Sequence, residues 1–298
     1  MIRISKILCP VDLSDASATA FAYASMLSRW YDAPVTAIQM IWVGVPAMSP
    51  ATSPFVLTPE QIQDFTRDLE TFVAANTPPG SARATTVLRE GPMVQGILEE
   101  ARTRGADLIV MGTHGRGGFE HLVLGSVTEK VLRKATVPVL TVPPAVKKVP
   151  TAAQPFNAVL CAVDFSPASV RALRYAESLA AEGGKRLILL HVLDWVSDRP
   201  LPPGLSTEVA AAQRRQAGAA LEELRAAVSA DVREWCTCEE LTAIGRPYEQ
   251  ILRVADEQHA DLIVLGVHGR HAVERALFGS TTNQVVRRAT CPVLTVHP

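Results

Sequence analysis

Residues 106–116 read ADLIVMGTHGR, and residues 260–270, lying 154 positions later, read ADLIVLGVHGR. Each stretch is a short apolar run that leads directly into a glycine loop. A run that is apolar throughout is typical of a parallel strand that is buried on both faces. The same stretch at a long, fixed spacing indicates that the chain contains one folding unit twice.

The repetition extends far beyond this stretch. Residues 106–142 align without a gap on residues 260–296, with 22 of 37 positions identical. A shift of 152 positions aligns residues 7–28 with residues 159–180, with 11 of 22 identical. A period near 150 residues is too long for a solenoid repeat and long enough for a complete domain. The chain is therefore a duplicated domain.

We expect a first domain at residues 1–143 and a second at residues 156–298. Residues 144–155 between them hold several prolines, which favour an extended linker over a packed element. Each domain is large enough to bury roughly 68–70% of the surface that its unfolded chain exposes. Each copy can therefore have its own core.

Within each copy, apolar runs alternate with stretches of helical periodicity. We expect strands in the first copy at residues 7–11, 35–40, 84–89, 108–111 and 139–142. We expect strands in the second copy at residues 159–163, 187–192, 239–244, 262–265 and 293–296, with a long helix within residues 206–230. This order predicts an α/β fold of two tandem doubly wound domains, each an open five-stranded parallel sheet flanked by helices. Ligands of such sheets bind at the carboxyl ends of the strands.

The glycine loop after the fourth strand has the same spacing in both copies, Gly-x2-Gly-x9-Gly-Ser. Its members are Gly112, Gly115, Gly125 and Ser126 in the first copy and Gly266, Gly269, Gly279 and Ser280 in the second. Glycine lets backbone N–H groups approach an anion, and a helix start adds unpaired N–H groups and a positive dipole end. Arg116 and Arg270 add a permanently charged donor. The loop predicts a phosphate site, although such loops also serve only to turn the chain; it is neither a Walker loop nor a Rossmann fingerprint.

An aspartate follows the first strand of each copy, Asp12 and Asp164. A carboxylate there can accept hydrogen bonds from ribose hydroxyls or from an adenine amino group. Its alternative role is to cap the next helix. Ser14 and Ser166 can provide that cap equally well, which leaves the aspartates for a ligand.

With these motifs the chain resembles the ATP-binding subclass of the universal stress protein family, in a tandem two-domain form with a fold like that of the adenine nucleotide alpha hydrolases. The resemblance covers both halves. It implies that the aspartates and a residue ending the second strand hold adenosine, and that the glycine loops hold the phosphates. The further site residues that it implies are Pro10, Val11, Met40 and Val127 in the first copy and Ala162, Val163, Val192 and Thr281 in the second.

The resemblance implies ATP, with Mg²⁺, as the ligand of a regulator in stress or dormancy adaptation. It also implies that residues 139–142 and 293–296 pair within one chain as a pseudo-dimer, and it leaves open a homodimer and the protein partner. Two alternatives stay open: a slow ATPase or nucleotide-transferring enzyme, and a partner-binding module in which nucleotide is incidental. His271-Ala272 replaces Gly117-Gly118 in the second loop, so the two affinities need not be equal.

Composition narrows these possibilities. The 29 basic and 30 acidic residues give a net charge of −1, which supplies no basic field for nucleic acid. No apolar run reaches about 18 residues, so no membrane span is expected. Five cysteines do not form a disulfide framework, and the N-terminal stretch lacks a secretory signal, so we expect a cytoplasmic protein.

Two further signals are interpreted as structural. His114 and His268 lie between motif glycines without a nucleophile or an orienting carboxylate at recognisable spacing, so no catalytic residue is assigned. Cys236 and Cys238 have the wrong spacing for a zinc knuckle, so no metal site is expected. Alternation along a strand would place both of their sulfurs on one face.

Overall fold

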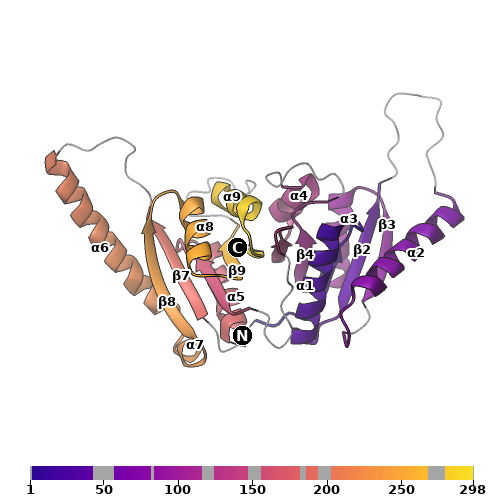
Figure 1. The fold of residues 1–298 in the computed structure, drawn as a ribbon, viewed down its shortest axis with the longest axis horizontal. Helices are drawn as coiled ribbons and strands as arrows, with labels where there is room; N and C mark the ends of the chain where they lie inside the picture. Colours follow the sequence, from indigo (N-terminus) through magenta and orange to yellow (C-terminus); the bar gives the residue numbers. More distant parts are fainter. Residues whose placement is uncertain are drawn as a thin grey trace. The chain divides into compact units, whose positions relative to one another are not determined.

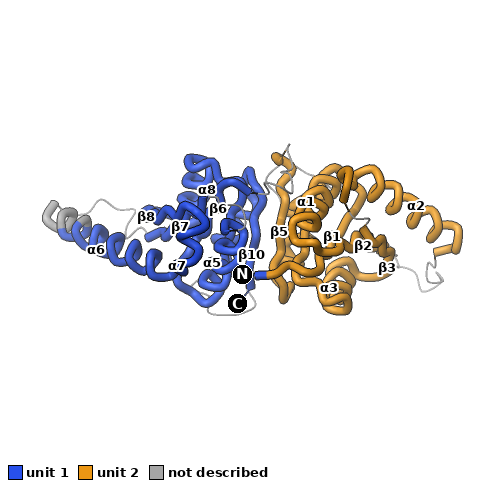
Figure 2. The backbone as a smooth tube through the Cα atoms, turned by 90° about the horizontal axis from the view of Figure 1, so that it is seen from below, with its two compact units in different colours: residues 1–2, 156–298 blue, residues 3–155 orange. Residues whose placement is uncertain are grey.

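The structure, a computed structural model, describes residues 2–42, 57–81, 84–115, 124–146, 156–181, 186–193, 203–267 and 279–297. The chain divides into two compact units, one of residues 3–155 and one of residues 1–2 and 156–298 (Figure 2). The units correspond to the two sequence copies. Residues 147–155 of the expected linker lie outside the described residues.

The first unit alternates strands and helices along the chain (Figure 1). Its elements are β1 (Ile7–Pro10), α1 (Asp15–Tyr31), β2 (Val35–Ile41), α2 (Pro59–Asn76), β3 (Thr85–Glu90), α3 (Met93–Arg104), β4 (Leu108–Gly112), α4 (Ser126–Lys134) and β5 (Val139–Val142). The strand order is β3-β2-β1-β4-β5, and every neighbouring pair is parallel. The order reverses between β1 and β4, so the loops that follow these two strands meet at one edge of the sheet.

Within the residues that the structure describes, the second unit repeats this plan with one additional helix. Its elements are β6 (Ala158–Ala162), α5 (Pro167–Ala181), β7 (Arg186–Leu193), α6 (Pro203–Ala227), α7 (Ala230–Trp235), β8 (Thr237–Ile244), α8 (Pro247–Glu257), β9 (Leu262–Gly266), α9 (Ser280–Arg288) and β10 (Val293–Val296). Its strand order is β10-β9-β6-β7-β8, again parallel throughout. The predicted doubly wound α/β fold is confirmed for both units. The expected pairing of β5 with β10 stays a prediction.

The core of each unit lies on the two central strands. All five residues of β4 are buried, and Leu8 of β1 and Leu160 of β6 are fully buried. Burial of one such side chain stabilises the fold by about 1.5–3 kcal/mol. The apolar runs of the sequence are therefore the strands that have helices on both faces.

One aspartate in each copy fixes the start of the central strand. Asp107 accepts hydrogen bonds from the backbone N–H groups of Ser5 (2.8 Å) and Lys6 (3.1 Å). Asp261 does the same for Asn157 (2.7 Å) and Ala158 (3.1 Å). Asp107 and Asp261 are the aspartates of the two stretches quoted from the sequence. They occupy equivalent positions of the two copies because they have the same structural role.

The second copy differs from expectation around residue 230. The long helix α6 ends at Ala227, and a separate helix, α7, follows it. Ser229 has extended dihedral angles (φ −66°, ψ 148°), which interrupts the helix and starts the next one. The predicted strand at residue 239 begins two residues earlier, at Thr237.

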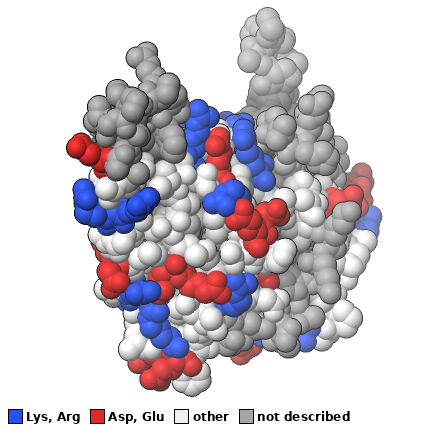
Figure 3. All heavy atoms as spheres, turned by 60° about the vertical axis from the view of Figure 1, so that its left-hand side comes forward, with Lys and Arg blue, Asp and Glu red and all other residues white. Residues whose placement is uncertain are grey.

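The surface carries charges of both signs. On the face shown in Figure 3, basic and acidic side chains are interspersed. Many form short-range ion pairs along helices, such as Arg253 with Glu257 at 2.7 Å. Such mixing is typical of a solvated surface. Within the described part of the chain, no helix has both the length and the apolar character that a membrane crossing requires.

The N-terminus of α2 supplies a stability test. Thr58 Oγ1 accepts a hydrogen bond from the Gln61 N–H (3.2 Å), and Gln61 Oε1 accepts one from the Thr58 N–H (2.9 Å). This capping box satisfies two N–H groups that the helix itself cannot bond. We expect Thr58→Ala to lower the free energy of unfolding of the first unit by about 1 kcal/mol in urea titrations followed by circular dichroism. Thr66→Ala, inside the same helix, is the control; an equal loss there would contradict the role of the cap.

Candidate functional site

A cavity of about 610 Å³ opens at the carboxyl ends of the strands of the first unit, where the strand order reverses. It lies between the loop after β1, the end of β2, the loop after β4 and the start of α4. Its lining includes nine expected site residues, Pro10, Val11, Asp12, Met40, Gly112, Gly115, Gly125, Ser126 and Val127. The tenth expected residue, Arg116, lies outside the described residues.

Asp12 shapes the turn between β1 and α1. Its Oδ1 accepts hydrogen bonds from the Ser14 N–H (3.1 Å) and the Ser14 hydroxyl (2.5 Å). This turn holds Leu13 at φ 63°, which is uncommon for a residue with a side chain. The second unit has the same turn, with Phe165 at φ 61°. Unusual backbone angles at the same place in both copies point to a constrained site.

Ser14, rather than Asp12, caps the following helix. Ser14 is the N-cap residue of α1, and its hydroxyl accepts a hydrogen bond from the Ser17 N–H (3.3 Å). In the second unit Ser166 accepts from the Ser169 N–H (3.2 Å) in the same way. The carboxylate therefore does not act as the helix cap and lies at the cavity wall.

Gly115 lies directly against this carboxylate. A Cβ atom built on Gly115 would be 2.5 Å from Asp12 Oδ2, closer than a Cβ carbon can approach without displacing its neighbour. The loop after β4 therefore reaches the aspartate only because it has a glycine at this position. Gly115 of the glycine motif and Asp12 are about 100 residues apart in the chain, but they lie in direct contact in the folded unit.

The start of α4 faces the cavity without a capping side chain. Gly125 is the N-cap residue and forms no side-chain cap hydrogen bond. Its N–H donates to the Thr113 carbonyl (2.8 Å), and the Thr128 hydroxyl donates to the Gly112 carbonyl (2.9 Å). These two bonds fix the helix start against the end of β4. The first-turn N–H groups and the helix dipole suit an anion, as in phosphate-binding helix starts.

The other side of the cavity is mainly apolar. Its lining there comes from α3, β2, β4 and the segment before α4: Ile38, Met40, Met93, Ile97, Met111 and Leu124. Gly96 of α3 makes room for Met40, since a Cβ atom on Gly96 would overlap Met40 Cε. Such a surface is suited to a flat, weakly polar ring. The spacing of the sequence motifs gave no signal for these residues, and Met40 was expected only from the resemblance to the family.

Four polar residues of the cavity were also not expected as ligand contacts. Ser17, Gln39, His114 and Thr128 all contribute to its lining. The amide Oε1 of Gln39 is buried and has no hydrogen-bond partner within the described part of the structure. His114, interpreted from the sequence as loop or phosphate-adjacent packing, contacts the Thr113 hydroxyl through Nδ1 (2.9 Å). The recurrence of Thr128 as Thr282 in the second copy was the available signal for the threonine.

The second unit has the same framework at its own strand ends. Asp164 Oδ1 accepts from the Ser166 N–H (3.1 Å), the Thr282 hydroxyl donates to the Gly266 carbonyl (2.9 Å), and Gly279 is the N-cap residue of α9. Ala162 ends β6, Val163 follows it, Val192 is the penultimate residue of β7, and Ser280 and Thr281 begin α9. Gly269 and Arg270 lie outside the described residues.

The second unit differs beside this framework. His191 replaces Gln39, and its Nδ1 contacts the Val163 carbonyl at 2.7 Å. Its ring also lies 4.9 Å from the ring of Phe165. The polar group of His191 is thus used within the fold, so the two sites do not have identical surroundings.

Comparisons with known proteins agree on one family. The sequence model of the universal stress protein family matches residues 3–143 and again residues 155–297. A universal stress protein of Mycolicibacterium smegmatis is 28% identical over 301 residues, which cover 98% of this chain and 97% of that protein. A universal stress protein of Methanocaldococcus jannaschii is 35% identical over 137 residues, 46% of this chain and 81% of that protein.

Solved structures agree on the fold. The crystal structure of a universal stress protein from Archaeoglobus fulgidus superposes with a TM-score of 0.66 at 22% identity, covering 99% of this chain and 97% of that one. A putative universal stress protein from Pseudomonas aeruginosa gives a TM-score of 0.61 at 19% identity, covering 99% and 94%. Both likenesses extend over the two units.

Proposed function

The chain belongs to the universal stress protein family, with two copies of the family domain in tandem, and we propose that it is an ATP-binding regulator in adaptation to stress or dormancy. One observation supports this proposal above the others. In the first unit a carboxylate, a glycine loop, an uncapped helix start and an apolar wall line a single cavity. These are the groups that a ribose, a phosphate chain and a purine base require.

The geometry suggests an orientation for the nucleotide. The base would lie against Met40 and the apolar wall, and the ribose hydroxyls would donate to Asp12. The phosphates would accept hydrogen bonds from the N–H groups at the start of α4, where the helix dipole favours negative charge. Mg²⁺ needs oxygen ligands and is usually held by substrate phosphates with few protein groups. The Ser126 hydroxyl, at the start of α4 where the phosphates would lie, fits that requirement.

We extend the proposal to both units. The aspartate turn, the threonine bond to the strand-ending glycine and the glycine N-cap recur in the second unit at equivalent positions. Two nucleotides per chain are therefore proposed, with unequal affinities because His191 takes the place of Gln39. Occupancy would shift the population of loop conformations and so alter binding of a partner.

Calorimetric titration of the full chain with ATP and Mg²⁺ tests this function. We expect two bound nucleotides per chain and adenine nucleotide in the mass spectrum of the native protein as purified. Absence of binding at millimolar ATP would refute the proposal. Phosphate release measured in the same samples separates a regulator from the enzyme alternative, since turnover at ordinary enzymatic rates would favour the enzyme.

The contact between Gly115 and Asp12 supplies a more specific prediction. Gly115→Ala places a methyl group 2.5 Å from Asp12 Oδ2 and must displace either the loop or the carboxylate. We expect the ATP affinity of the first site to fall about tenfold, equivalent to about 1.4 kcal/mol. Gly218→Ala is the control, because no atom lies within 4 Å of a Cβ atom built on Gly218 and this residue of α6 does not line the cavity. An equal loss of affinity for the control, measured by calorimetry, would show that the contact between Gly115 and Asp12 is not the cause.

A further inference from the structure

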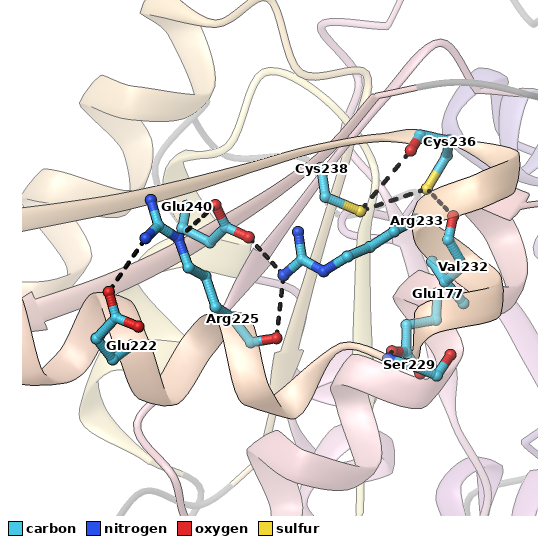
Figure 4. A network of polar contacts seen from close by, with 9 residues as sticks. All are labelled: Glu177, Glu222, Arg225, Ser229, Val232, Arg233, Cys236, Cys238 and Glu240. Atoms are coloured by element: carbon cyan, nitrogen blue, oxygen red, sulfur yellow. Dashed lines mark hydrogen bonds and ion pairs between the residues drawn. The ribbon is translucent and has the colours of Figure 1, made fainter.

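Two thiols of the second unit lie together at the junction of α7 and β8. The Sγ atoms of Cys236 and Cys238 are 3.7 Å apart (Figure 4). Cys236 is the extended C-cap residue that follows α7, and its N–H donates to the Val232 carbonyl (3.0 Å). Cys238 is the second residue of β8 and pairs with Leu187 of β7. Because side chains alternate along extended backbone, residues two apart present both sulfurs on one face.

This pair differs from the other cysteines of the chain. Cys9, Cys161 and Cys291 are buried in different parts of the fold, whereas Cys238 is partly exposed beside Cys236. Packing alone would be satisfied by any small apolar residue at these two positions. Two adjacent thiols, one of them reachable from solvent, form a bidentate soft ligand.

We propose that Cys236 and Cys238 bind one Cu(I) ion as a two-thiolate site. Soft thiolate ligands select Cu(I) among biological cations, and this ion is stable with only two sulfur ligands. A structural zinc site would need four ligands. Among the residues that the structure describes, no group of three or more His, Cys, Asp or Glu side chains is arranged to hold a metal. The number of donors therefore favours Cu(I) over Zn²⁺.

The charge balance of binding follows from the ordinary state of the two thiols. An unperturbed cysteine has a pKa of about 8.5, so both side chains are mainly protonated at neutral pH. Binding one Cu⁺ forms two S–Cu bonds, breaks two S–H bonds and releases two protons, which leaves a site of charge −1.

A guanidinium lies beside the pair to balance that charge. Arg233 lies beside the two cysteines (Figure 4), and its positive charge would attract the negative charge of the metal-bound thiolates. Arg233 is held by the Glu240 carboxylate (2.6 Å) and the Arg225 carbonyl (3.0 Å) (Figure 4). The charged groups that surround the thiols are Glu177 of α5, Arg225 of α6, Arg233 of α7 and Glu240 of β8.

The thiol pair is separate from the nucleotide framework of the same unit. It lies at the beginning of β8, whereas Gly266 ends β9, and all strands between them are parallel. The two places are therefore at opposite edges of the sheet. Loss of the thiols is expected to leave ATP binding unchanged. The experiments on the copper site and on the proposed nucleotide function therefore test two independent proposals.

An anaerobic competition titration tests the site. Full-length protein, kept reduced with ascorbate, is titrated with Cu(I) against the chromophoric chelator bicinchoninate. We expect one Cu(I) per chain, with release of two protons measured in weakly buffered solution. Cys236→Ser and Cys238→Ser should each abolish competition with the chelator. Cys291→Ser is the matched control and should retain it.

Folding of the variants is checked by their ATP titration and circular dichroism. X-ray absorption of copper-loaded wild type gives a readout that needs no variant, and we expect only sulfur neighbours around the copper. Competition that survives in both serine variants would overturn the proposal. So would the absence of copper uptake by the wild-type chain, or an absorption spectrum dominated by nitrogen and oxygen neighbours.

Discussion

Replacing Ser126 with glutamate is expected to remove ATP from the site of the first unit. Ser126 is the first residue of α4 and contributes to the cavity where the phosphates would lie. A carboxylate there would repel the triphosphate at close range in a partly desolvated site. Two like charges about 4 Å apart repel by about 4 kcal/mol at an effective dielectric constant of about 20. Allowing for exposure of Ser126, we expect about a 100-fold loss of affinity, or about 2.7 kcal/mol.

The fold should tolerate this change. An acidic residue in the first turn of a helix interacts favourably with the helix dipole, so α4 should not be destabilised. Calorimetry should show the stoichiometry of tight binding falling from two nucleotides per chain to one. Ser126→Gln introduces a side chain of the same size as glutamate but without its charge, and should retain most of the affinity. Ser280→Glu should remove the nucleotide from the second unit. Full binding by the double glutamate variant would mean that the helix starts do not hold the phosphates.

The second large effect is expected on stability, from Gly266→Ala. A Cβ atom on Gly266 would lie 2.8 Å from the carbonyl carbon and Cβ of Ala168 and from the backbone nitrogen of Ser169. Ala168 and Ser169 are buried in α5, which packs on β9, and backbone atoms cannot move aside as a flexible side chain can. We expect the free energy of unfolding of the second unit to fall by about 3 kcal/mol, at the upper end of the usual cost of overpacking.

The equivalent glycine of the first unit is the matched control. At Gly112 the nearest atoms to a built Cβ are the carbonyl oxygens of Ala16 and His114, both 3.2 Å away. Gly112→Ala should therefore cost less, about 1 kcal/mol. Hydrogen exchange of the β9 and β4 amides under native conditions would measure the two costs separately. An equal loss of unfolding free energy at both positions would show that the closer contact with the helix in the second unit does not add to the cost of the substitution.

The position of the cavity in the first unit was predictable because the residues that determine it form local motifs. The strand-ending aspartate, the glycine spacing and the serine after the third glycine each lie within a short stretch, and each appears twice. A loop that follows a buried parallel strand must emerge at the carboxyl edge of the sheet. The sequence could therefore indicate which loops form the site. It also indicated that Ser14 can cap α1, and the hydrogen bond from the Ser17 N–H agrees.

The apolar wall of the cavity could not be predicted in the same way. Met93, Ile97 and Met111 have the spacing of ordinary core residues, and they reach the cavity only because of how α3 and β4 pack. The fit of Met40 against Gly96 joins residues on two elements separated by β3 and α2. The thiol contact was predicted in part: alternation placed both sulfurs on one face, although Cys236 follows a helix that was not expected.

By itself the sequence determined the duplication, the alternation of strands and helices, and the two loops that carry the glycine motif. Periodicity and short motifs record these features because they arise from neighbouring residues in the chain. Only the tertiary structure decided that Gly115 lies against Asp12, that Leu13 takes a positive φ, and which side chains complete the cavity. Those features depend on strand register and helix packing, which bring together residues far apart in the sequence and leave no fixed spacing to read.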